Sequence, residues 1–146
     1  MDQALKRIPA QSRLAAIISD SLDKVASADS WMEAYQSIHG RYQQYTHCQM
    51  YQEIGTLINT LKFADSVGQG ICIQVSQGND TDSFGATAGS VLGCLLGPGY
   101  LDPKWLAPLN SRIAHGLSDF HEYEMPAIAA RMSQLPNKLF EASISN

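Results

Sequence analysis

The sequence predicts an all-α fold, an orthogonal array of six to eight helices in a single domain spanning residues 1–146. Apolar residues recur at helical spacing along most of the chain, and no two segments show the alternation that paired strands would need. A glycine at every fourth position, from Gly85 to Gly97, indicates a helix packed very closely against a neighbour. With 45% hydrophobic residues, the chain has enough apolar content for one core.

Four helices are predicted before the glycine run. Residues 12–28 carry an apolar stripe at 3.6-residue spacing, and residues 31–39 form a shorter helix that the glycine at position 40 ends. Residues 49–64 have a wide apolar face. Residues 65–76 have an ambiguous period, because their second half alternates like a strand. We predict a helix there, since no second strand exists to pair with it.

Three segments follow in the second half of the chain. The glycine-rich helix covers about residues 82–96, and the Gly-Pro-Gly run at 97–99 ends it. An Asp-Pro pair opens the next predicted helix, residues 102–117, with Asp as N-cap and Pro at the first helical position. A last helix covers residues 126–135, and residues 136–146 are predicted to form a frayed tail.

Charge and hydropathy exclude some classes of partner. The formal net charge is −4, and Lys and Arg are scattered singly apart from Lys6-Arg7, so we expect no nucleic-acid partner. The longest apolar stretch, around residues 91–96, is far too short to span a bilayer. Residues 1–10 lack the apolar core of a signal peptide, so we expect a cytoplasmic protein with no membrane partner.

Three cysteines, Cys48, Cys72 and Cys94, are widely spaced along the chain. Their odd number and spacing fit neither a disulfide framework nor a Cys-x-x-Cys zinc pattern. We expect them to be small buried hydrophobic residues, which suits a reducing compartment.

The most informative segment runs from Gln77 to Ser83, just ahead of the glycine-rich helix. Asp80 and Asp82 are two residues apart, and in a turn that enters a helix such carboxylates can converge on one point. Ser83 adds a neutral oxygen, and this set of hard oxygen ligands suits Mg²⁺ or Mn²⁺. Gly78 has no side chain, so a ligand can approach the backbone closely. Together with the glycines, the pattern suggests a buried metal site.

A simpler interpretation stays open for the same residues. Aspartate is a favoured N-cap, and a second aspartate in the first turn complements the helix dipole. Close helix packing alone would likewise explain the glycines.

A resemblance to a known family bears on this choice. The stretch from Gln77 to Gly97 resembles the C-terminal signature of the ADP-ribosylglycohydrolase family, which includes the dinitrogenase reductase-activating glycohydrolases. That signature is roughly Gly-Gly-Asp-Thr-Asp-Ser/Thr, followed by a small-residue helix and then by a helix with Pro and Trp. The matching residues here are Gly78, Asp80, Thr81, Asp82, Ser83, Ala86, Ala88, Gly89, Gly93, Gly97, Pro103 and Trp105. The resemblance covers about residues 8–117.

The resemblance implies an all-α enzyme that binds ADP-ribose through a pair of Mg²⁺ ions. Such enzymes hydrolyse the bond joining ADP-ribose to a modified protein side chain or small group. The resemblance places metal ligation on Asp80, Asp82 and Ser83, and the ligand border on Gly78, Asn79 and Thr81. Asn79 replaces the usual second glycine, so it would narrow the approach to the ligand or hydrogen-bond to it.

Members of that family are roughly twice as long, near the upper range for one domain, and carry a second acidic cluster of the form Thr-Asp-Asp-Thr in their N-terminal half. This chain has no such cluster, and therefore looks like a C-terminal half: a split gene, a truncation or a diverged remnant. Half a ligand set would bind Mg²⁺ weakly. The alternative is a non-catalytic helical module that binds ADP-ribose, a partner chain or a second copy of itself.

Other polar residues are weaker candidates. Glu53 is expected on the solvated side of its helix, with a general-base role as the alternative. The histidines lack the i, i+4 spacing of helical metal ligands, although His47 could point into a cleft. Tyr42, Tyr45 and Tyr51 are expected to be packing residues with solvated hydroxyl groups.

Overall fold

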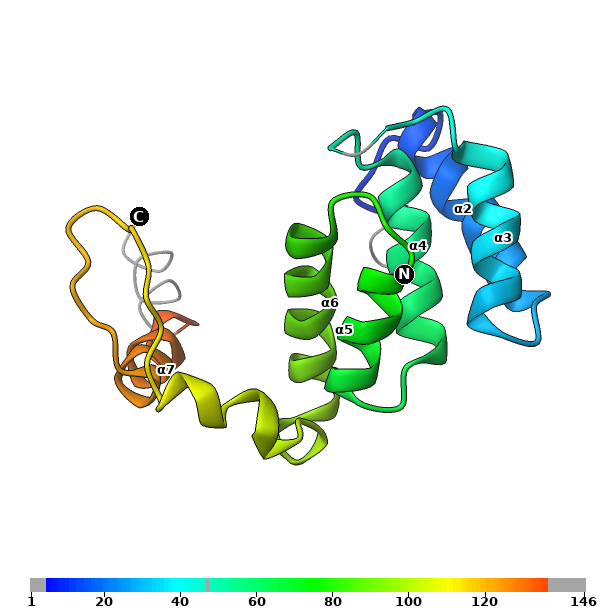
Figure 1. Cartoon of the computed structure of the whole chain (residues 1–146). Helices are drawn as coiled ribbons and strands as arrows, with labels where there is room; N and C mark the ends of the chain where they lie inside the picture. Colours follow the sequence, from blue (N-terminus) through cyan, green and yellow to red (C-terminus); the bar gives the residue numbers. More distant parts are fainter. Residues whose placement is uncertain (1–4, 47, 137–146) are drawn as a thin grey trace. The chain divides into compact units, whose positions relative to one another are not determined.

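The computed structural model describes residues 5–46 and 48–136, which divide into two compact units, 1–101 and 102–146. Figure 1 shows the helices of both units. The described residues are helical and contain no strand, only an isolated antiparallel bridge between Arg112 and Glu124. The all-α class is therefore confirmed. The orientation of His47 and the tail predicted after Pro136 lie outside the described residues.

The first unit is built from α2 to α6 and a short 3-10 turn, η1. Several of these helices begin at a serine whose hydroxyl accepts a hydrogen bond from an N–H of the first turn. Ser12 caps α2, Ser30 caps α3 and Ser66 caps α5. The bounds are α2 (Arg13–Ala26), α3 (Trp31–Tyr42), α4 (Tyr51–Phe63), α5 (Val67–Ser76), α6 (Thr81–Leu96) and η1 (Pro98–Tyr100).

The apolar core of this unit joins α2, α3 and α4, whose apolar stripes face one another. Its buried members are Ile17, Ile18, Val25, Ala34, Ile38, Tyr42 and Ile58. Gly55 lets α4 approach the other two helices closely, because a Cβ there would lie 2.8 Å from Ser21 Oγ and 2.9 Å from Ile38 Cγ2.

Two predicted boundaries in this region are wrong. The helix predicted to end at Gly40 continues to Tyr42, whose ring is buried and whose hydroxyl donates to Asp20 Oδ2 at 2.5 Å. This tertiary anchoring outweighs the weak helix propensity of glycine. The next helix begins at Tyr51 rather than at residue 49, because Met50 adopts a left-handed φ of 54°.

The helix predicted in place of a strand at residues 65–76 is confirmed as α5, and it lies alongside α6 (Figure 1). A Cβ at Gly89 would lie 3.1 Å from Ile71 Cδ1, and one at Gly85 would lie 3.2 Å from Val75 Cγ2. Gly70 contributes from the α5 side, where a Cβ would overlap a methyl of buried Leu92. The glycine-rich face therefore packs closely on α5, as its spacing indicates. Gly93 faces open space and takes no part.

The second unit differs most from the sequence prediction. The helix predicted over residues 102–117 is wrong: the chain forms two 3-10 turns, η2 (Pro103–Trp105) and η3 (Ala107–Leu109), and then a loop. Asp102 does cap the first turn, since its carboxylate accepts from Lys104 N at 3.0 Å. Asn110 and Ser111 then have positive φ values of 46° and 58°, which no right-handed helix can accommodate.

The rest of the second unit is a loop followed by α7 (Met125–Ser133), which confirms a last helix starting near Pro126. The loop is held by His115, whose Nε2 lies 2.7 Å from Glu122 O and whose ring stacks on Tyr123 at 4.9 Å. No helix in the described part of the chain is long and apolar enough to cross a membrane.

Candidate functional site

The segment from Gln77 to Ser83 is the turn that joins α5 to α6. Gln77 is the C-cap of α5, and Asp80 is the N-cap of α6. Between them, Gly78 and Asn79 have left-handed φ values of 81° and 63°. Glycine and asparagine are the residues that tolerate this conformation best, so the sequence itself encodes the tight reversal. A Cβ at Gly78 would meet nothing within 4 Å, which leaves this part of the turn open to a ligand.

One end of the turn is fixed by the buried side chain of Gln77, which reaches back into α4. Its Oε1 accepts from Asn59 Nδ2 at 2.8 Å, and its Nε2 donates to Thr60 Oγ1 at 2.9 Å and to Thr56 O at 3.1 Å. Gln74, one helical turn earlier, is also buried: its Oε1 accepts from Thr60 Oγ1 and its Nε2 donates to Thr56 Oγ1. These bonds form a polar network between α4 and α5 that holds the start of the turn.

The other end of the turn is fixed by Glu53, whose carboxylate Oε1 accepts from Asp80 N at 3.0 Å. Glu53 is only 2% exposed, so the expectation that it is solvated is wrong. It lies in the first turn of α4, one helical turn from Thr56, on the face that carries the polar network. The turn is therefore held at both ends by side chains of α4.

The predicted ligands lie together at the N-terminus of α6, but they are not buried at the centre of the domain as expected. Asp82 and Ser83 are exposed and Asp80 is half-buried, because α6 packs through the opposite face, on Gly85 and Leu92. The Asp80 side chain makes no capping hydrogen bond, although the residue occupies the N-cap position. The Ser83 backbone N–H nonetheless lowers the pKa of the Asp80 carboxyl, so the simpler capping interpretation stays open.

The two other predicted ligands, Asp82 and Ser83, both influence the Asp80 carboxyl. Hydrogen bonding with the Asp82 carboxyl, and next with the Ser83 hydroxyl, holds the pKa of Asp80 below its usual range. The nearby charge of Glu53 acts in the opposite direction. Two carboxylates that share a site disfavour each other's charged form, and a shared proton or a cation would relieve this repulsion.

Cys48 lies beside this group, with its Sγ donating to Asp80 Oδ2 at 3.7 Å. Partial desolvation, followed by the charge of Asp80, raises the pKa of the Cys48 thiol. The thiol therefore stays protonated near neutral pH and is a poor nucleophile. Cys48, Cys72 and Cys94 are all exposed, so the prediction of buried cysteines is wrong.

The donor atoms of the turn suit a hard divalent cation such as Mg²⁺ or Mn²⁺. Asp80 and Asp82 offer carboxylate oxygens and Ser83 a hydroxyl, whereas soft or nitrogen donors are limited to the neutral Cys48 thiol. Among the described residues, no group of three or more His, Cys, Asp and Glu side chains has a geometry that could hold a metal ion. The donor atoms of the turn are thus of the kind that Mg²⁺ uses, but the described residues do not by themselves form a metal site.

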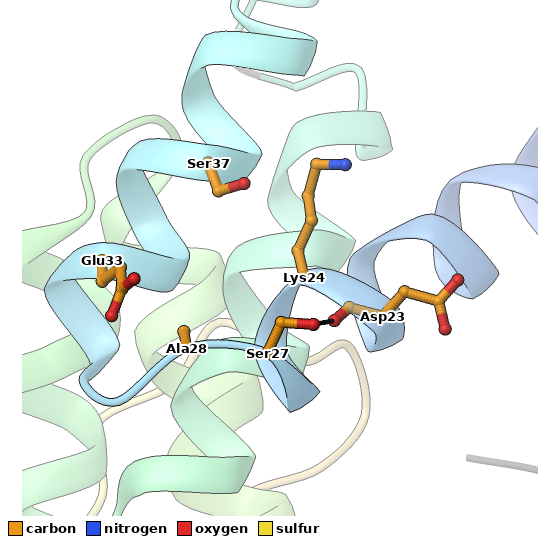
Figure 2. Close-up of a pocket in the computed structure, with 6 residues that line it drawn as sticks. All are labelled: Asp23, Lys24, Ser27, Ala28, Glu33 and Ser37. Carbon is orange, nitrogen blue, oxygen red and sulfur yellow. Dashed lines mark hydrogen bonds between the residues drawn. The ribbon is translucent and has the colours of Figure 1, made fainter.

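A separate pocket of about 280 Å³ lies at the turn between α2 and α3 (Figure 2). Figure 2 shows the Ser27 hydroxyl donating to the Asp23 carbonyl, a bond of 2.8 Å that closes the end of α2. The pocket is lined by Asp23, Lys24, Ser27, Ala28, Glu33 and Ser37. None of the sequence-predicted site residues lines it.

Comparison with known proteins identifies the family of the chain. The model of the ADP-ribosylglycohydrolase family matches residues 1–143. The chain belongs to the ADP-ribosylglycohydrolase family. The match extends beyond the residues 8–117 that carry the resemblance, and it supports a hydrolase-like function. No curated protein and no solved structure matches the chain.

Sequence reasoning missed the residues that support the turn, above all Glu53 and Gln77. A signal for them does exist: Glu53, Thr56 and Thr60 share one helical face through their i, i+3 and i+7 spacing. Polar residues that share one face of a helix ordinarily indicate that this face is exposed to solvent. Here that face is turned inward, towards α5 and the turn.

Proposed function

We propose that this chain takes part in metal-dependent hydrolysis of ADP-ribosyl linkages, with Asp80, Asp82 and Ser83 as metal ligands. The observation that carries the proposal is the placement of these three residues at the N-terminus of α6, with Asp80 as N-cap and Asp82 in the first turn. Family membership gives independent support.

In this proposal Asp80 and Asp82 ligate Mg²⁺, or Mn²⁺ in its place, and Ser83 supplies a third oxygen. When bound, the metal orients the ribose hydroxyls of ADP-ribose and lowers the pKa of a water molecule. Gly78, Asn79 and Thr81 border the ligand. The free N–H groups at the start of α6 favour a phosphate of ADP-ribose, because a helix N-terminus carries a partial positive charge.

The remaining metal ligands must come from elsewhere. The 146 residues contain no Thr-Asp-Asp-Thr run. We propose that this chain corresponds to the C-terminal half of a dinitrogenase reductase-activating glycohydrolase-like enzyme, and that an acidic cluster on another segment or chain completes a binuclear site. The substrate would be an ADP-ribosylated protein or small molecule.

Titration calorimetry with Mg²⁺ and ADP-ribose, separately and together, tests the proposal. We expect the combined ligands to bind the wild-type chain and not the double variant Asp80→Ala/Asp82→Ala. Asp102→Ala is the matched control, because Asp102 is also an N-cap aspartate but binds its own helix through Lys104 N. Binding that survives in the double variant contradicts the proposal.

A non-catalytic partner-binding module is the second candidate, and the outer face of α6 favours it. After Asp82 this helix has no charged residue, yet Val91 is 41% and Leu95 71% exposed. Exposed large apolar side chains on a helix without charges are a common feature of interaction surfaces, although Thr87 and Ser90 also lie on the exposed part of α6. A partner chain or a second copy would cover this face.

Light scattering on the purified chain tests this candidate. We expect self-association, or association with a partner chain, that Val91→Glu and Leu95→Glu abolish. A stable monomer over a wide concentration range would count against association between copies.

A further inference from the structure

We propose that Glu53 is the positioning residue of the Asp80–Ser83 site. The inference rests on the function proposed above and assigns a role to a buried carboxylate outside the predicted ligand set. Glu53 acts through the backbone of two segments, so that their side chains face one cation.

The geometry shows one carboxylate serving two separate segments. Oε2 of Glu53 accepts from Met50 N at 2.9 Å. Oε1 accepts from Asp80 N at 3.0 Å and from Cys48 N at 3.3 Å. The segment that precedes α4 and the turn that precedes α6 are therefore joined through one side chain, although 27 residues separate Glu53 from Asp80.

Helix capping alone does not account for this arrangement, and α3 provides the comparison. Glu33 occupies the same position in the first turn of α3, where its Oε2 accepts from Asp29 N at 3.0 Å. Together with the Glu33 N–H donating to Ser30 Oγ at 3.3 Å, this local bond resembles a capping box, except that Glu33 accepts from Asp29 N rather than from the N-cap N–H. Glu33 is exposed, whereas Glu53 is buried and uses its second oxygen to bind a distant segment.

The charge of Glu53 also points to a cation. Glu53, Asp80 and Asp82 lie close together, and none of the salt bridges among the described residues involves any of the three. Among the described residues, Glu53 accepts from three backbone N–H groups and from no basic side chain. A divalent ion on Asp80 and Asp82 would relieve the mutual repulsion of all three groups.

Glu53 also fixes the strained segment that faces Asp80. Cys48 and Met50 both have left-handed φ values, 64° and 54°, although neither is glycine. A left-handed conformation is unfavourable for residues other than glycine, and the bonds from the Cys48 and Met50 N–H groups to Glu53 hold the segment in it. Loss of the carboxylate would release Cys48 from Asp80 and free the Asp80 backbone at the same time.

Binding of Mn²⁺, measured by electron paramagnetic resonance on the full chain, tests the proposal with Glu53→Gln and its matched control Glu33→Gln. We expect Glu53→Gln to weaken binding by about tenfold or more, the usual effect of losing a group that orients a metal ligand. Glu33→Gln makes the same chemical change at the same helix position and should leave the affinity unchanged. If Glu53→Gln does not fold, Glu53→Asp keeps the charge, shortens the reach to Asp80 N and is expected to act in the same direction.

Hydrogen exchange of the Asp80 amide without metal gives a second readout. We expect protection in the wild type and in Glu33→Gln, and at least about tenfold faster exchange in Glu53→Gln, as local opening predicts. Wild-type Mn²⁺ affinity retained in Glu53→Gln would overturn the positioning role alone. A wild-type chain that binds no Mn²⁺ would overturn the proposed function and this role together, even if the amide is protected.

Discussion

Replacing Gln77 by alanine tests the polar network that holds the turn. The substitution removes the bonds to Asn59, Thr60 and the Thr56 carbonyl from a side chain that is only 2% exposed. Each bond contributes about 1 kcal/mol net, and partners left unsatisfied in the interior add to the loss. We expect the free energy of unfolding to fall by about 2–4 kcal/mol, a large part of the 5–15 kcal/mol typical of a domain.

Gln43→Ala is the matched control. Gln43 is the C-cap of α3, in the same right-handed conformation as Gln77, but it is exposed. Its loss should change stability by no more than about 0.5 kcal/mol. Urea unfolding followed by tryptophan fluorescence makes the comparison, in a Trp105→Phe background where Trp31 alone reports on the first unit. Equal stability of the two alanine variants would refute the network as a source of stability.

Three further substitutions give expected shifts in stability, each measured by thermal or urea unfolding. Tyr42→Phe removes the donor to Asp20 Oδ2 and should cost about 1 kcal/mol at neutral pH, a modest value because the Asp20 side chain is 37% exposed. Burial raises the pKa of Asp20, but hydrogen bonds, including that from Tyr42, lower it by more, so the pKa stays below its usual value of 3.8. The cost of Tyr42→Phe should therefore vanish as pH falls below about 4 and Asp20 protonates. Gly93→Ala should stabilise the chain by up to about 1 kcal/mol, because nothing lies near its Cβ. Gly70→Ala should destabilise it by about 1–3 kcal/mol, because its methyl would overlap a side chain of α6.

The features that the sequence predicts correctly are those determined by neighbours along the chain. Ser12 caps α2, the apolar stripes of α2 and α4 face the core, and Gly97 ends α6. The lack of any partner strand was enough to assign α5 as a helix. The reversal between α5 and α6 was also predictable, because Gly78 and Asn79 tolerate its left-handed backbone, whereas the ligand role of the aspartates stays a prediction.

The features that the sequence does not reveal depend on contacts between distant residues or on local backbone reversal. Residues 102–117 have helical apolar spacing, yet left-handed conformations at Asn110 and Ser111 interrupt them. Tyr42 extends α3 beyond Gly40 through a bond to a residue on another helix. The polarity of Glu53 led us to expect an exposed side chain. Polarity indicates an exposed face only when no polar partner lies inside the fold.

Titration calorimetry of ADP-ribose at increasing Mg²⁺ concentration tests the central claim most directly. If Asp80 and Asp82 hold the metal that binds ADP-ribose, affinity for ADP-ribose should rise with Mg²⁺ in the wild-type chain and be independent of Mg²⁺ in Asp80→Ala/Asp82→Ala. The reciprocal effect, tighter Mg²⁺ binding at saturating ADP-ribose, must then have the same magnitude. Affinity for ADP-ribose that is insensitive to both Mg²⁺ and the two aspartates would contradict the account.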